Sequence, residues 1–72
     1  MQYWTLVDSA GDVAICQLVQ TSHGLEVQCM VQESEQVLNA SVVKTLHDAF
    51  NQSEAWRASY AAKGWRTGPG DS

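Results

Sequence analysis

Two cysteines carry the most reactive side chains in this chain of 72 residues. Cys16 and Cys29 lie on either side of residues 21–24, Thr-Ser-His-Gly, whose composition is typical of a tight turn. If this turn closes a hairpin about its centre, the two cysteines stand opposite each other and share one face. Such an arrangement permits a cross-strand disulfide or one half of a metal site.

The surrounding sequence favours plain structural thiols over either chemistry. Zinc requires two further ligands, and no Cys-x-x-Cys or His-x-His spacing is present. The residues after Met1 include neither a basic segment nor a long apolar run, so no secretory leader is predicted and a reducing cytoplasm is expected. We therefore predict two free core thiols, no bound metal and no cofactor.

The remaining polar residues do not assemble a catalytic pattern. His47 and Asp48 are neighbours, but adjacent residues of a helix point about 100° apart and do not face each other. His23 falls in the predicted turn. None of the serines lies in a Gly-x-Ser-x-Gly elbow, and the glycines form no phosphate-binding loop. The sequence predicts that the protein is not an enzyme.

The charge distribution argues against nucleic-acid binding. Residues 1–35 contain five acidic residues and no Lys or Arg, a sum of −5, whereas residues 36–72 contain four basic and three acidic residues, a sum of +1. Aromatic side chains such as Trp4 can stack on bases, but platforms of that kind carry basic flanks. The late basic residues suit the negative end of a helix dipole. An acidic first half suits a basic partner instead.

Four segments have the composition of β-strands. The clearest alternation runs through residues 25–32, where Leu25, Val27, Cys29 and Val31 alternate with more polar residues. Strands are expected at about 2–8, 13–20, 25–32 and 37–44. For the fourth segment a competing interpretation begins the helix near Ser41, but two consecutive valines favour a strand.

A single helix is predicted over residues 46–63. Thr45 can cap the first turn, and Asp48, three residues later, can reach back as in a capping box. Gly64 is the natural stop, and in a Schellman ending Trp65 would pack against Tyr60. The apolar stripe at helical spacing consists of Leu46, Ala49, Phe50, Ser53, Trp56 and Tyr60.

These elements predict an α+β fold. Strands joined by short turns make a three- to four-stranded antiparallel β-meander, and the C-terminal α-helix packs on one face. Residues 1–66 form a single small domain, and residues 67–72 are expected to be a flexible tail. Trp4 and Leu6 are expected in the core, with their facing dependent on a bulge at Gly11. The expected strand contribution to the core also contains Ala14, Cys16, Leu18, Leu25, Val27, Cys29, Val31, Leu38, Ala40 and Val42.

The second face of the predicted sheet retains many apolar residues. A sheet with a solvated back normally alternates with polar residues, but the second strand is apolar on both faces. The outward set also includes Tyr3, Thr5, Val7, Val37 and Val43. We expect a non-catalytic protein-binding module that self-associates, most simply as a homodimer. The candidate interface residues are Val13, Ile15, Gln17, Val19, Gln28 and Met30.

An alternative function follows from charge. The acidic first half could make the protein an accessory or inhibitor, of the kind mobile elements encode, that blocks a basic surface of a nucleic-acid enzyme. No association with a membrane is expected, since the longest mostly apolar stretch, residues 13–19, is far too short to span a bilayer.

Overall fold

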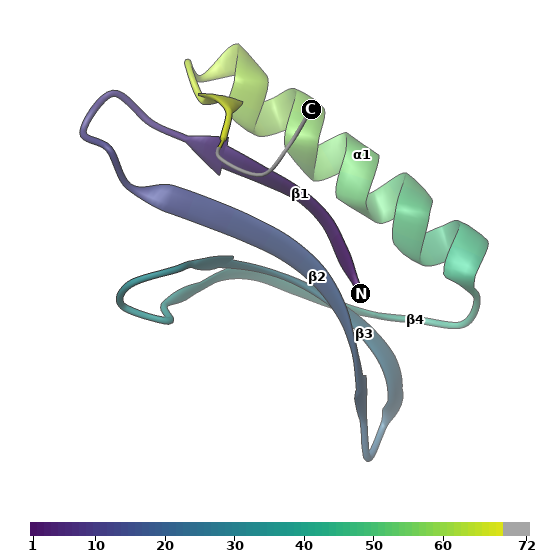
Figure 1. Cartoon of the computed structure of the whole chain (residues 1–72). Helices are drawn as coiled ribbons and strands as arrows, with labels where there is room; N and C mark the ends of the chain where they lie inside the picture. The colour runs from purple at the N-terminus through teal and green to yellow at the C-terminus, as the bar shows by residue number, and fades with distance from the viewer. Residues whose placement is uncertain (69–72) are drawn as a thin grey trace.

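The computed structural model describes residues 1–68 and is an α+β structure. One helix packs on one face of an antiparallel sheet of order β4-β3-β2-β1-β5 (Figure 1), which confirms the predicted class with one strand more than expected. The elements are β1 (Gln2–Val7), β2 (Val13–Thr21), β3 (Gly24–Val31), β4 (Val37–Val43), α1 (Leu46–Ala62) and β5 (Arg66–Thr67).

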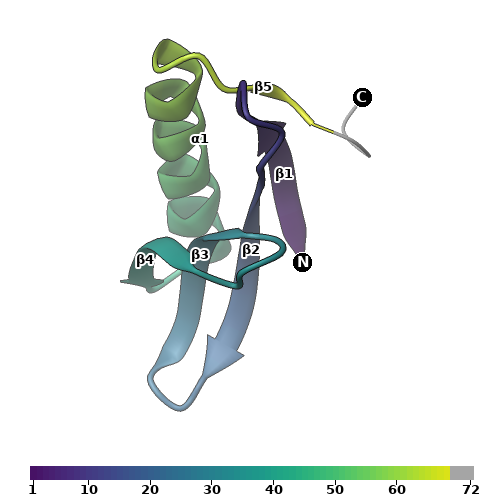
Figure 2. The same cartoon turned by 90° about the vertical axis from the view of Figure 1, so that its left-hand side faces the viewer.

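The extra strand comes from residues that the sequence assigns to the end of the domain and to the tail. Thr67 pairs with Leu6, and the Gly68 amide donates a hydrogen bond to the Thr5 carbonyl at 2.9 Å. The chain reverses after α1 and returns beside β1, so β5 covers part of that edge of the sheet (Figure 2). The rest of the predicted tail, 69–72, lies outside the described residues.

Both ends of the helix follow their predicted chemistry. The Thr45 hydroxyl accepts a hydrogen bond from the Asp48 amide at 3.0 Å, as an N-cap does. At the other end Gly64 has φ of 103°, and the amides of Gly64 and Trp65 donate to the carbonyls of Ala61 and Tyr60. This is the bond pair of a Schellman motif. The Trp65 and Tyr60 rings meet edge to face with centroids 5.6 Å apart, which confirms the predicted contact.

Trp4 anchors the core between the sheet and the helix. Its side chain is 1% exposed, and its indole Nε1 donates a hydrogen bond of 2.9 Å to the Ser53 carbonyl in the middle of α1. Tyr60 meets the same indole edge to face. Trp4 points toward the helix after a register shift between Gln2 and Trp4, and no shift lies at Gly11, where a bulge was considered. The other buried apolar side chains are Leu6, Ala14, Cys16, Val27, Cys29 and Ala49.

The facing predicted for β4 is wrong. Asn39 pairs with Cys29 and Ser41 with Val27, so these two polar residues share the helix side, while Ala40 and Val42 are exposed on the other face. Val43, expected to point outward, lies on the helix side and packs against the core. The cause is a bulge opposite the Cys29/Met30 step, which inserts one residue and exchanges the two faces of the strand. Leu38, beside the bulge, is half-buried and still packs against the core.

Two residues of the predicted helical stripe are also exposed. Leu46 is 60% and Phe50 50% exposed, whereas Ala49, Ser53 and Tyr60 are buried as expected. The Phe50 ring retains one edge contact with Tyr3, at a centroid distance of 6.4 Å. The first turns of α1 therefore bury only the side of the helix that carries the small residues.

Replacing Trp4 by Phe should lower the free energy of unfolding by about 2 kcal/mol, because the buried indole hydrogen bond and part of the ring volume are lost. Urea denaturation followed by far-UV circular dichroism measures this change. Trp56→Phe is the matched control, since Trp56 is only half-buried. Equal losses in both variants would contradict the anchoring role of Trp4.

Candidate functional site

The two cysteines meet in the centre of the sheet, beneath the helix. Cys16 and Cys29 are directly opposite across β2 and β3, as predicted, and neither side chain is exposed. The Tyr60 hydroxyl from α1 hydrogen-bonds to Cys29, and the Asn39 amide nitrogen donates to the Tyr60 oxygen. Four side chains from three strands and the helix thus form one buried polar cluster.

The backbone pattern defines the geometry of this cysteine pair. The Gln32 amide donates to the Val13 carbonyl at 2.8 Å, so these two residues form a hydrogen-bonded pair. Such pairs alternate along an antiparallel ladder, and the unbroken register makes Cys16 and Cys29 a non-hydrogen-bonded pair. Their Cα atoms then lie about 4.5 Å apart, within the range a disulfide spans. Both are free thiols here.

The thiols are held in their protonated form. Burial, with a smaller contribution from Cys29, raises the pKa of Cys16 to about 12. Burial also raises the pKa of Cys29, although the hydrogen bond from Tyr60 acts in the opposite direction. Burial and the neighbouring Cys29 raise the pKa of Tyr60 to about 12. Since the thiolate is the nucleophile and the metal ligand, burial disfavours the reactive form of both thiols.

The other candidate chemical groups remain apart. His23 is exposed in the β2–β3 turn, and His47 is exposed in the first turn of α1 beside Asp48. The buried Ser53 hydroxyl donates to the Phe50 carbonyl at 2.7 Å, so it is occupied within the helix. Within residues 1–68, no three His, Cys, Asp or Glu side chains gather as a metal site. No helix in the same part of the chain has the length and apolar character needed to cross a bilayer.

The helix lies on one side of the sheet (Figure 2). All six residues of the predicted interface lie on the opposite face, because the register pairs Ile15 with Met30 and Gln17 with Gln28 and the alternation along β2 brings Val13 and Val19 to the same side. Each of the six is half-buried. We call this surface the outer face; its residues are Val13, Ile15, Gln17, Val19, Gln28 and Met30.

Hydrogen bonds order the polar groups of the outer face. The Gln17 amide nitrogen lies 3.4 Å from the Met30 sulfur, and the Gln28 amide nitrogen donates to Glu26 at 2.7 Å. Two residues expected on this side behave differently. Tyr3 turns toward the helix at the register shift, and Thr5 is only 4% exposed beside the buried Gly68.

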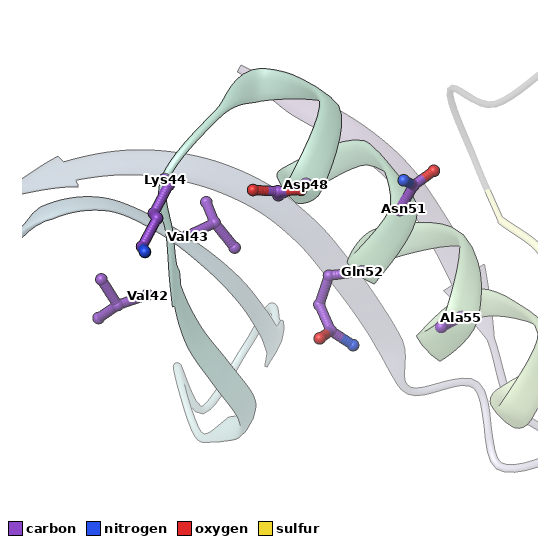
Figure 3. A pocket seen from close by; sticks show the side chains of 7 residues that line it. All are labelled: Val42, Val43, Lys44, Asp48, Asn51, Gln52 and Ala55. Carbon is purple, nitrogen blue, oxygen red and sulfur yellow. The ribbon is translucent and has the colours of Figure 1, made fainter.

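The sequence does not reveal two features near β4. The first is the exposure of Val42, at 58%, whereas Val37, at 50%, is exposed as its place in the outward set predicts. The second is a groove of about 480 Å³ between the end of β4 and the first half of α1 (Figure 3). The exposure of Val42 follows from the bulge in β4, which no residue pattern in the sequence indicates. The groove is lined by Val42, Val43, Lys44, Asp48, Asn51, Gln52 and Ala55.

No family model, curated protein or solved structure matches this chain at a significant level.

The raised thiol pKa predicts a fall in stability at alkaline pH. The unfolded chain releases the Cys16 proton near its ordinary pKa of 9.0, whereas the folded chain retains it to about 12. The stabilisation by the protonated thiol is therefore complete below pH 9 and is lost as the pH rises toward 12. The free energy of unfolding should fall by up to about 1.4 kcal/mol per pH unit for each thiol. Urea unfolding at several pH values measures the slope.

Cys16→Ala is the control for this measurement, because it removes one buried thiol and leaves the other titrating groups in place. Its stability should fall less steeply above pH 9 than that of the wild-type chain. Identical slopes for the two proteins would show that the buried thiol does not contribute.

Proposed function

We propose that this protein is a small, non-catalytic protein-binding module that self-associates through the outer face of its sheet. The observation that carries the proposal is the uncovered face of β2, where Val13, Ile15 and Val19 are apolar although the helix covers only the opposite side. An antiparallel sheet with one solvated side normally presents polar residues there. A second copy of the chain would remove these side chains from water.

The area of the outer face fits a weak dimer. Four strands about 4.8 Å apart, each about seven residues long at about 3.3 Å per residue, present on the order of 450 Å². Two copies would bury about 900 Å², which is the size of weak, transient interfaces and below the roughly 1,200 Å² of stable ones. A chain of 72 residues also gains more from added apolar burial than a larger domain does.

Polar groups on the outer face would define the register of a dimer. Gln17 and Gln28 are directly opposite each other near the middle of the patch, and both amides can donate and accept. Glu26 at the margin is the acidic side chain among these neighbours. A two-fold axis near the glutamines would place each glutamine beside its copy and would bring no like charges together at the centre.

The two free, buried thiols suit a reducing compartment, which supports a cytoplasmic location.

Ile15→Asp should weaken self-association at least tenfold, because it introduces a carboxylate into the centre of the apolar patch. The fold should persist, since Ile15 faces away from the helix. Sedimentation equilibrium measures the mass, and Gln20→Asp on the opposite side of β2 is the control. A wild-type chain that stays monomeric at about 1 mM would contradict the proposal.

The placement of the acidic residues supports a second candidate, an acidic accessory protein that covers a basic surface. Asp8 and Asp12 flank the β1–β2 turn, and Glu33 and Glu35 lie in the β3–β4 turn. In a meander these two turns occupy the same end of the sheet, so four carboxylates share one end (Figure 1). A concentration of like charge favours fast association with a basic partner.

A lysine-rich peptide tests this candidate directly. At low salt it should shift the amide NMR signals of the two acidic turns and leave those of the β2–β3 turn unchanged. The shifts should vanish at about 0.5 M salt, because exposed charges are then screened. Absence of shifts at low salt, or shifts that resist salt, would contradict an electrostatic site.

A further inference from the structure

The two edges of the sheet are protected to different degrees. At the β1 edge the chain adds β5, a strand of two residues that contains Arg66. At the other edge, within residues 1–68, β4 pairs with β3 on one side only. Its seven residues, VLNASVV, include no charge and no proline. Natural sheets normally shorten, charge or cover their edges, because an open strand pairs with other chains.

The hydrogen-bond pattern identifies which backbone groups of β4 are open. The Gln32 amide bonds toward β2 and the Val31 amide toward β4, so the odd-numbered residues of β3 face β4. Their partners, Asn39, Ser41 and Val43, direct their own groups back to β3. The N–H and C=O groups of Ala40 and Val42 therefore point away from the sheet.

We propose that the β4 edge pairs with the β4 edge of a second copy of this chain, antiparallel about a two-fold axis at Ser41. In this register Ala40 lies opposite the partner's Val42 and Val42 opposite the partner's Ala40. The four open backbone groups of each copy then make four intermolecular hydrogen bonds. The product is a continuous sheet with twice the five strands of one copy.

Features beside the strand favour a second copy as the occupant. A strand of charged or proline-rich peptide would find no complementary charge along VLNASVV, whereas the uncharged edge is complementary to itself about Ser41. The two-fold axis is perpendicular to the sheet and keeps both helices on one side. The groove beside α1 then faces the other copy, with the amides of Asn51 and Gln52 available to it.

This edge is distinct from the outer face, and the two associations are measured separately. Because Ala40 and Val42 lie on the same side of the sheet as the outer face, amide exchange is measured by NMR on the full chain carrying Ile15→Asp, in which outer-face association is weakened. Asn39, Ser41 and Val43 should be protected at every concentration, because their amides bond within the sheet. Exchange at Ala40 and Val42 should slow about tenfold or more between about 10 μM and 1 mM. Unchanged fast exchange at these two amides would overturn the proposal, whereas loss of outer-face binding would leave the result intact.

Two substitutions sharpen the experiment. Ala40→Pro removes an outward N–H and no bond within the sheet, so it should abolish the slow exchange at Val42 while the fold persists. Val42→Lys places a charge at the edge and should abolish the slow exchange at the Ala40 amide. This variant serves as the test if the proline variant fails to fold. Leu46→Lys, at an equally exposed apolar position outside β4, should have no effect. Protection that survives both β4 substitutions would overturn edge pairing.

Discussion

The contact of Trp4 with the middle of α1 determines which surfaces of this protein are free. The indole hydrogen-bonds to the Ser53 carbonyl and meets the Tyr60 ring, so the helix lies over the central strands on one side of the sheet. A single helix cannot cover the other side. Because Trp4 takes the helix side, the alternation of β1 and the registers of β2 and β3 place Ile15, Gln17, Gln28 and Met30 on the uncovered side.

The cysteine cluster belongs to the same layer of the core. Cys16 lies opposite both Trp4 and Cys29, and Tyr60 connects Cys29 to Asn39 at the edge strand. Buried hydroxyl and thiol groups of this kind are tolerated when they bond to each other, and they then favour one register over its neighbours. The cluster explains how a strand with Asn39 on its inner side can still be part of a folded sheet.

Much of this architecture was predictable from local sequence signals, and the exceptions lie where no local signal exists. Thr45, Gly64 and the turn before Gly24 act within a few residues, so the helix ends and the opposition of Cys16 and Cys29 were correctly predicted. The irregularities at Tyr3 and Leu38 depend on contacts with distant elements: the first turns Tyr3 toward the helix, and the second exchanges the two faces of β4. β5 has two residues, too few to show any period.

The bulge in β4 also connects the core to the open edge. With the face order expected from sequence, Leu38, Ala40 and Val42 would point into the core and the polar pair Asn39 and Ser41 outward. The observed register reverses this for Ala40 and Val42, and it leaves apolar side chains exposed beside unpaired backbone groups. The polar cluster around Tyr60 requires Asn39 on the inner side, so the fold cannot satisfy the cluster and bury Val42 at once. The exposure of this edge is thus a consequence of how the core is satisfied, and pairing with a second strand would satisfy the open backbone groups while the Asn39–Tyr60 bond is kept.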